Sequence, residues 1–292
     1  RLGVDVGGTF TDLLLVNEQS GELHTAKVPS TPEDSSIGVF NGITKVCSNA
    51  NVDPSKITSV MHGTTVATNT ILTGTGAKVG LITTKGYRQV LQIARSFVPG
   101  GLGGWVIYNK SDPIAPLSLT IEADERISAK GEVLSKLKKG QLAKDIKELS
   151  KKGVEAITVS LINSYANDQH EKEIKREIQK KKLLPKIPVS LSSQVVPEMQ
   201  EYERTITTVA NSYVRPKVAE YVKNLQRGLK KRMNDVKLRI LRSDGGLASA
   251  KASSDSPVSL LMSGPAGGVS GAIWIAKQAG YKNLLPFDMG GT

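Results

Sequence analysis

Short apolar runs separated by polar turns dominate the beginning of the chain. Residues 2–6 and 12–16 are two apolar, β-rich runs, and the link between them contains Gly7 and Gly8. This spacing predicts a hairpin with a bulged or widened turn. A third run at residues 23–28 predicts a third strand. We therefore expect the chain to begin with a strand hairpin and a neighbouring strand.

Further along, apolar runs of strand length alternate with apolar residues at helical spacing. The predicted strands are 57–61, 78–83, 156–162, 189–191, 237–241 and 284–289, and the predicted helices are 65–72, 87–94, 139–151, 168–182 and 266–279. Strands that alternate with helices at this spacing indicate βαβ units and a mainly parallel sheet.

Glycine and proline mark the breaks in this pattern. Residues 96–120 are rich in both and predict a long loop, a kind of segment that is often functional. The prolines within 182–188 predict a domain boundary, which gives an amino-terminal domain over 1–185 and the start of a second over 186–292. Pro216 lies between two apolar stripes, so it either kinks a helix or starts a new one.

Composition narrows the classes of partner. The net charge is +12, and most of the excess lies in residues 126–242, which hold 27 basic and 13 acidic side chains. The lysines alternate with acids and aromatic content is 4%, so a solvated basic face is favoured over a nucleic-acid patch. No apolar run approaches the ~20 residues that cross a bilayer, and the single cysteine, Cys47, indicates a reducing compartment. We expect a cytoplasmic protein with no nucleic-acid or membrane partner.

One short motif occurs twice, near the two ends of the sequence. An apolar run leads into Asp-x-Gly-Gly-Thr at Asp5–Thr9 and again at Asp288–Thr292. Glycine lets the backbone approach a bulky anion, free amides and the threonine hydroxyl can donate to phosphate oxygens, and the aspartate can hold Mg²⁺. A single copy would indicate only a turn. Two copies predict phosphate loops on the two halves of a nucleotide cleft.

The candidate residues follow from this interpretation. Asp5 and Asp288 are the predicted catalytic and metal-organising residues, and the predicted nucleotide-binding residues are Gly7, Gly8, Thr9, Thr11, Gly290, Gly291 and Thr292. The sequence has no P-loop, no G-x-G-x-x-G after the first strand and no zinc motif.

Three further places carry two interpretations each. His62 is either a catalytic group or a core residue, and the Gly63, Thr64 and Thr65 that follow it suit an anion or a substrate amide. Arg204 either binds a phosphate or a carboxylate substrate or forms a surface ion pair with Glu201 or Glu203. Asp244 belongs either to a turn or to a loop of the cleft.

Seven segments in chain order resemble the family of hydantoinase A, 5-oxoprolinase and the acetone carboxylase β-subunit. They are 3–12, 61–70, 83–88, 201–205, 243–246, 263–268 and 287–292. The resemblance implies an α/β fold of the actin-like ATPase (ribonuclease H-like) type, incomplete here, with mixed sheets. It also implies that both loops grip the phosphates of ATP with Mg²⁺, and it admits Mn²⁺ or K⁺. Since the adenosine-binding segment of this family follows the second loop, we expect the chain alone to bind ATP poorly.

The resemblance implies an ATP-dependent hydrolase of cyclic amides, of the hydantoin or 5-oxoproline type, that acts through phosphorylation of a carbonyl group. A glycine-rich stretch after Arg95 favours the alternative, a subunit of an ATP-dependent ketone carboxylase. A non-catalytic, ATP-gated binding module is the third possibility. The expected partners are a small carbonyl substrate and either further copies of the chain or a hydantoinase B-like subunit or domain. All versions require Asp5 and Asp288 to face a shared crevice.

Overall fold

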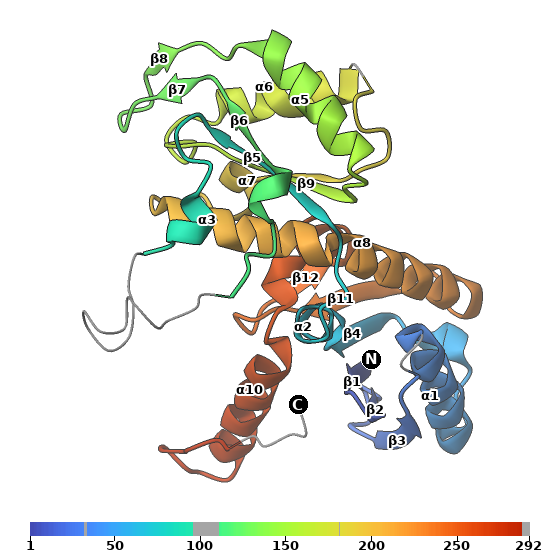
Figure 1. The fold of residues 1–292 in the computed structure, drawn as a ribbon. Helices are drawn as coiled ribbons and strands as arrows, with labels where there is room; N and C mark the ends of the chain where they lie inside the picture. Colours follow the sequence, from blue (N-terminus) through green and yellow to red (C-terminus); the bar gives the residue numbers. More distant parts are fainter. Residues whose placement is uncertain (32–33, 96–110, 181, 288–292) are drawn as a thin grey trace. The chain divides into compact units, whose positions relative to one another are not determined.

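The computed structural model describes residues 1–31, 34–95, 111–180 and 182–287 (Figure 1). The chain forms two compact units, and the first of them is discontinuous in sequence. Unit 1 combines Arg1–Gly74 with Lys217–Thr292, and unit 2 is Thr75–Pro216. The predicted loop at 96–120 lies largely outside the described residues. Within these residues, no helix is both long and apolar enough to cross a membrane.

Unit 1 is built on a six-stranded mixed sheet in the order β12-β11-β4-β1-β2-β3. The strands are β1 (Leu2–Val6), β2 (Phe10–Val16), β3 (Leu23–Pro29), β4 (Ser59–Thr64), β11 (Lys237–Leu241) and β12 (Leu247–Ser249). The predicted hairpin is confirmed, because β1 and β2 pair antiparallel. At the centre β11, β4 and β1 run parallel, so their carboxyl ends meet at one edge.

One face of this sheet is fully buried. Val4 of β1 is level with Leu13 of β2 and with His62 of β4, and all three side chains are almost inaccessible. Helix α1 (Ser35–Ala50) packs here closely enough that a Cβ at Gly42 would overlap the Leu13 side chain. Helix α1 is not evident from the sequence alone, because its glycines and β-branched residues give it a weak helix propensity.

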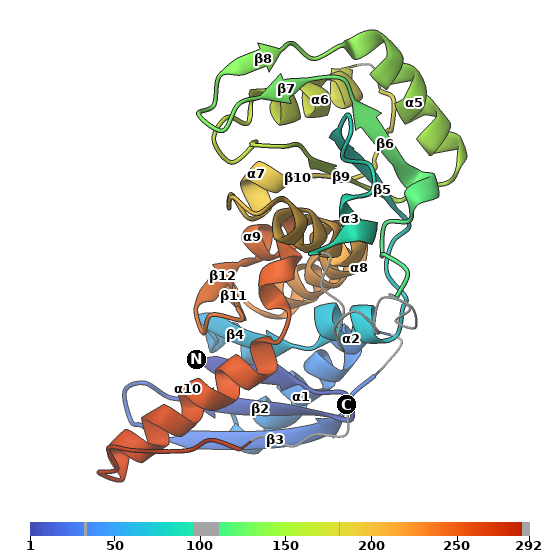
Figure 2. The ribbon, with the colours of Figure 1, turned by 60° about the vertical axis from the view of Figure 1, so that its left-hand side comes forward.

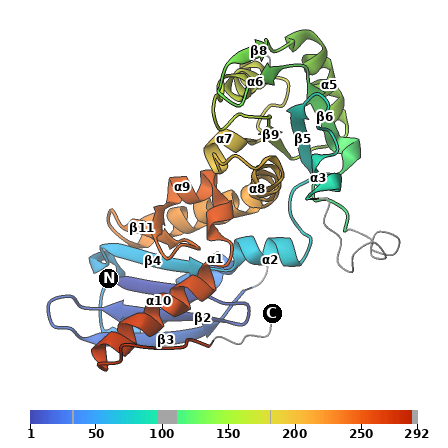
Figure 3. The ribbon, with the colours of Figure 1, turned by 90° about the vertical axis from the view of Figure 1, so that its left-hand side faces the viewer.

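The opposite face carries Asp5 and Gly63, and helix α10 (Ser263–Gln278) lies over it. A Cβ at Gly267 would come within 2.7 Å of the side chain of Leu241, which is next to Ile240, the partner of His62 in the sheet. Figures 2 and 3 show α10 crossing the strands on the side away from α1. Gly267 therefore lets the helix approach the sheet closely.

Unit 2 is built on a four-stranded sheet in the order β10-β9-β5-β6, and every pair is parallel. The strands are β5 (Val79–Thr84), β6 (Thr120–Ala123), β9 (Ala156–Ser160) and β10 (Val189–Leu191), and β7 (Arg126–Ile127) pairs with β8 (Val133–Ser135) in a separate ribbon. Ile82 belongs to one apolar cluster and Leu81 to another, so both faces of β5 are buried. This explains the nearly continuous apolar strands, which are typical of parallel sheets.

The remaining elements complete the two units. They are α2 (Val66–Leu72), α3 (Val90–Ile93), α5 (Lys139–Lys151), α6 (Gln169–Lys180), α7 (Ser192–Val195), α8 (Glu201–Arg232), α9 (Ala250–Asp255) and the short 3₁₀ turns η1 (Pro54–Lys56), η2 (Leu117–Leu119) and η3 (Pro257–Leu260). Helix α8 continues through Pro216, so no new helix starts there. The predicted strand at 284–289 is wrong over 284–287, which are irregular and exposed, and its last two residues lie outside the described part.

Candidate functional site

The carboxyl ends of β1, β4 and β11 bring several predicted residues to one edge of the unit 1 sheet. Asp5 and the Gly7–Thr9 turn lie at the end of β1, Gly63–Thr65 end β4, and Asp244 follows β11. Segments more than 200 residues apart in sequence therefore meet at this edge. Carboxyl ends of parallel strands are where open α/β sheets bind ligands.

The hairpin turn offers hydrogen-bond donors to solvent. The Gly7 amide donates to the Phe10 carbonyl at 3.0 Å and closes the turn from inside. In contrast, Gly8 and Thr9 are exposed, and their amides have no hydrogen-bond partner within the described residues. Two adjacent free amides beside a threonine hydroxyl form a donor set suited to phosphate oxygens.

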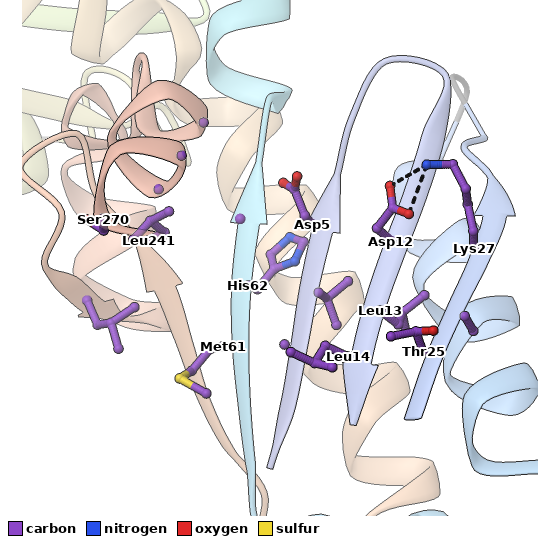
Figure 4. A pocket seen from close by; sticks show the side chains of 18 of the residues that line it. Asp5, Asp12, Leu13, Leu14, Thr25, Lys27, Met61, His62, Leu241 and Ser270 are labelled. Carbon is purple, nitrogen blue, oxygen red and sulfur yellow. Dashed lines mark hydrogen bonds and ion pairs between the residues drawn. The ribbon is translucent and has the colours of Figure 1, made fainter. Parts of the chain in front are cut away.

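Asp5 lies next to Gly63 on the open face. A Cβ at Gly63 would be 2.9 Å from Asp5 Oδ1, so only glycine leaves this position free for the carboxylate. Asp5, Gly63 and Gly267 are among the residues that line a cavity of about 900 Å³ between the sheet face, β12 and α10. Figure 4 shows Asp5 on its strand beside β4.

The cavity also contains charged residues that the sequence analysis did not select. Lys27 Nζ forms an ion pair with Asp12 at 3.0 Å, and Asp12 lies directly across from Asp5 on the neighbouring strand (Figure 4). Alternation along β2 and β3 could have identified them, because Asp12 and Lys27 occupy the same face as Asp5. Lys27 therefore offsets the charge of Asp12, and Asp5 is the carboxylate that lies beside Gly63.

His62 lies on the opposite face from Asp5. In the parallel pairing of β1 and β4, Asp5 is level with Gly63, so the preceding side chain points to the buried face. The His62 ring is 1% exposed, and its Nε2 is 2.8 Å from the Tyr221 hydroxyl on α8. Burial lowers the pKa of His62 to about 4, so the ring is neutral at physiological pH. Its observed contact is therefore with α8 and not with the carboxylate at the open face.

The threonines that follow Gly63 tie strand ends together. Thr65 Oγ1 donates to the Val6 carbonyl at 3.2 Å, which joins the end of β4 to the end of β1 just before the glycine turn. Thr64 is buried, and its Oγ1 accepts from the Val66 amide at the start of α2. These contacts hold the edge of the sheet in register.

Thr11 and Asp244 have partners of their own. Thr11 is fully buried, and its Oγ1 lies 3.0 Å from Ser30 Oγ, behind the turn. Asp244 is exposed and accepts hydrogen bonds from the Gly246 amide and from Arg242, at 2.9 and 2.6 Å. These are the contacts of a tight turn, which Gly245 completes at φ +77°.

Arg204 belongs to unit 2 and is buried inside it. Its guanidinium donates to the carbonyl groups of Leu161, Glu198 and Met199 at 2.7–2.9 Å and to Ser192 Oγ at 3.2 Å. With 1% exposure, Arg204 is neither the surface ion pair nor the ligand-facing group that the sequence suggested. It stabilises the packing of α8 within that unit.

The second copy of the motif lies outside the described residues. Asp288, Gly290, Gly291 and Thr292 are all in this part, so the expected pairing of Asp5 with Asp288 stays a prediction. Within the described ranges there is no group of three or more His, Cys, Asp or Glu side chains suited to a metal ion.

Comparison with known proteins agrees with the fold and with these motifs. The model of the hydantoinase/oxoprolinase N-terminal region matches residues 1–182, and the hydantoinase/oxoprolinase model matches residues 204–292. Caprolactamase subunit alpha of Pseudomonas jessenii is 31% identical over the whole chain, which spans 42% of that protein. The 5-oxoprolinase of Dictyostelium discoideum is also 31% identical, and the chain spans 26% of it.

Solved structures extend the likeness to three dimensions. The ATP-dependent caprolactamase of Pseudomonas jessenii matches all of this chain and 42% of its own with a TM-score of 0.87 at 31% identity. A nucleotide-free acetone carboxylase matches 97% of this chain and 41% of its own with a TM-score of 0.85 at 26% identity. The expected α/β, actin-like ATPase fold with mixed sheets is confirmed. The chain spans less than half the length of each of these proteins.

Proposed function

The chain belongs to the hydantoinase/oxoprolinase family, and on this premise we propose that it forms part of the nucleotide site of an ATP-dependent enzyme that hydrolyses cyclic amides. The observation that carries the proposal is the exposed turn after β1. There the amides of Gly8 and Thr9, which have no hydrogen-bond partner among the described residues, lie a few residues beyond Asp5, at the carboxyl edge of a parallel strand group. Its chemistry is that of a phosphate-binding loop.

Each residue of this edge has a distinct role in the proposal. Gly8 and Thr9 donate amide hydrogens to phosphate oxygens, and the Thr9 hydroxyl adds a third donor. Asp5 would hold Mg²⁺, directly or through water, and Gly63 leaves the space in which the carboxylate lies. When bound, MgATP supplies the phosphoryl group that makes a stable carbonyl reactive. The contribution of the chain is positioning and charge neutralisation, which dominate catalysis of phosphoryl transfer.

The second motif is part of the same proposal. We expect Asp288, Gly290, Gly291 and Thr292 to bind the phosphates from the other side, as the resemblance implies. A division of the sequence near residue 185 into two family domains belongs to the proposal too. A cytoplasmic location also belongs to the proposal. So does assembly with further subunits, which is supported by the name of the relative, caprolactamase subunit alpha.

A ketone carboxylase subunit is the second candidate function. The likeness to acetone carboxylase over 97% of the chain favours it, because the TM-score of this likeness is close to that for the caprolactamase. Both functions use the same nucleotide site and differ in the carbonyl compound that is activated.

Phosphate release by the full-length protein tests the proposal. We expect MgATP hydrolysis to be stimulated by a lactam, a hydantoin or 5-oxoproline, and stimulation by small ketones instead would identify the carboxylase. Turnover that ignores every carbonyl compound would indicate an ATP-gated binding module. Asp5→Asn should reduce turnover about 100-fold. The matched variant is Asp12→Asn, which makes the same charge change directly across the hairpin and should retain most of the turnover.

A further inference from the structure

Ser30, immediately after β3, donates two hydrogen bonds to the hairpin turn at Gly7–Thr9. Its hydroxyl donates to the Gly7 carbonyl at 2.8 Å, and its amide donates to the Thr9 carbonyl at 2.9 Å. A single residue from a different segment thus binds the carbonyl groups on both sides of Gly8. The sequence alone does not indicate a role for this serine, because its contact with Gly7 spans 23 residues.

The direction of these hydrogen bonds follows from the number of protons available. The Ser30 hydroxyl has one proton, and that proton points to the Gly7 carbonyl. In the 3.0 Å contact between the two hydroxyls, Thr11 Oγ1 must therefore be the donor and Ser30 Oγ the acceptor. Since Thr11 is completely buried, it fixes the orientation of the Ser30 hydroxyl.

Helix α1 anchors the segment that carries Ser30. The Gly38 amide, in the first turns of α1, donates to Thr31 Oγ1 at 3.0 Å. A Cβ at Gly38 would lie 3.3 Å from Thr11 Oγ1 and 3.4 Å from the Pro29 carbonyl, so the helix packs directly against this polar cluster. Ser30 therefore lies between Pro29, which pairs with Phe10 in the sheet, and Thr31, which is hydrogen-bonded to α1.

Because a peptide group is planar, this contact also fixes the direction of the Gly8 N–H, the proposed hydrogen-bond donor to phosphate. The Gly7 carbonyl and the Gly8 amide belong to one planar trans peptide and point in opposite directions. When Ser30 binds the carbonyl, the Gly8 N–H is turned away from Ser30 and toward solvent. Without that bond, two consecutive glycines could rotate this peptide freely, and ligand binding would have to supply the ordering.

We propose that Ser30 is a positioning residue of the nucleotide site, which aims the Gly8 amide at a phosphate group of ATP by binding the opposite end of the same peptide. This inference rests on the proposed function, because it requires the turn to bind phosphate. It gives Thr11 and Gly38 supporting roles. Thr11 orients the serine hydroxyl, and Gly38 lets α1 approach both residues.

Calorimetric binding of ATP and of adenosine to the full-length protein tests the proposal. Ser30→Ala should weaken ATP binding about fivefold, the effect of one hydrogen bond, and leave adenosine binding unchanged because adenosine has no phosphate. Ser30→Thr keeps the hydroxyl and should restore ATP binding to near the original value. Thr11→Val keeps the shape of the side chain and should weaken ATP binding by a smaller factor. The matched control is Ser20→Ala, in the turn at the other end of the sheet, where Ser20 Oγ accepts from the Glu22 amide.

The outcomes are distinguishable. Equal ATP affinity in Ser30→Ala and the original protein would overturn the inference and leave the proposed function intact. Parallel losses of ATP and adenosine affinity would assign Ser30 a general role in stability and would also overturn it. If Ser30→Ala does not fold, unchanged ATP binding by Thr11→Val contradicts the inference. Absence of ATP binding by the original protein would reject the proposed function itself.

Discussion

At the scale of single residues, Gly63 is the position at which the backbone of β4 lies directly beside the Asp5 carboxylate. We predict that Gly63→Ala displaces the Asp5 carboxylate, because the added Cβ would lie 2.9 Å from Oδ1. ATP turnover should fall at least tenfold, by about 1.4 kcal/mol or more in transition-state stabilisation, with little change in melting temperature. Gly3→Ala is the control on the same face of the sheet, where the new Cβ would have ordinary contacts of 3.8–4.0 Å. Equal turnover in the two variants would refute the placement of Asp5.

The buried ring of His62 makes stability depend on pH. Its pKa is about 4 in the folded protein and near 6.5 in the unfolded chain, so the unfolded chain binds the extra proton between these values. Stability therefore decreases as the pH falls from 6.5 to 4, and His62 accounts for about 3 kcal/mol of the decrease. Urea unfolding across the range from neutral pH down to the folded-state pKa should show a shallower decrease for His62→Gln. The same pH dependence in both proteins would contradict a buried, neutral ring.

A substitution at Arg204 tests whether this residue has a structural role or a ligand-binding role. Arg204→Lys loses the fork that reaches three carbonyl groups, and we expect the free energy of unfolding to fall by about 3 kcal/mol. ATP affinity of the folded protein should not change. Denaturant unfolding and calorimetry measure the two quantities. Weaker nucleotide binding with unchanged stability would show that Arg204 contacts the ligand.

The sequence predicted residue types at the site better than side-chain directions. The turn at Gly7–Thr9 and its proximity to Gly63–Thr65 could be expected, because glycines and hydroxyl residues follow apolar strands. His62 and Thr11 were candidates for the same site, yet both side chains point to the buried face. That direction depends on the register between strands, which a single residue pattern does not determine.

At the scale of elements, α1 and α8 show where local patterns mislead. Helix α1 begins at an Asp34 cap and ends at Asn51 in the left-handed region, but glycines at its contact face weaken the helical signal. Those glycines are required by packing, since Gly42 lies against Leu13. Helix α8 shows the reverse, because tertiary packing keeps it helical through a proline that sequence rules treat as a break or a kink.

Pro216 should therefore weaken α8. Proline has no amide hydrogen for the Ser212 carbonyl four residues earlier, and we predict that Pro216→Ala restores this bond and stabilises the protein by about 2 kcal/mol. The midpoint of thermal unfolding should rise by about 4 °C. Lys217→Ala, at the exposed neighbouring position, controls for general helix propensity. A lower midpoint for Pro216→Ala would mean that the packing around α8 requires the proline.

At the scale of the whole molecule, chain order and spatial organisation differ. Unit 1 takes β1–β4 from the start of the sequence and β11 and β12 from its last third, and β11 lies beside β4 at the centre of the sheet. The repeated motif indicated that distant segments belong together, but it did not show which strands pair. The boundary near residue 185 stays a prediction for this chain.

The central claim is that the turn after β1 binds the phosphates of ATP beside Asp5. A crystal structure of the full-length protein with Mg²⁺ and a non-hydrolysable ATP analogue tests it most directly. We predict phosphate oxygens within about 3 Å of the Gly8 and Thr9 amides and Mg²⁺ within reach of Asp5, directly or through one water molecule. Nucleotide bound elsewhere, with this turn open to solvent, would contradict the account.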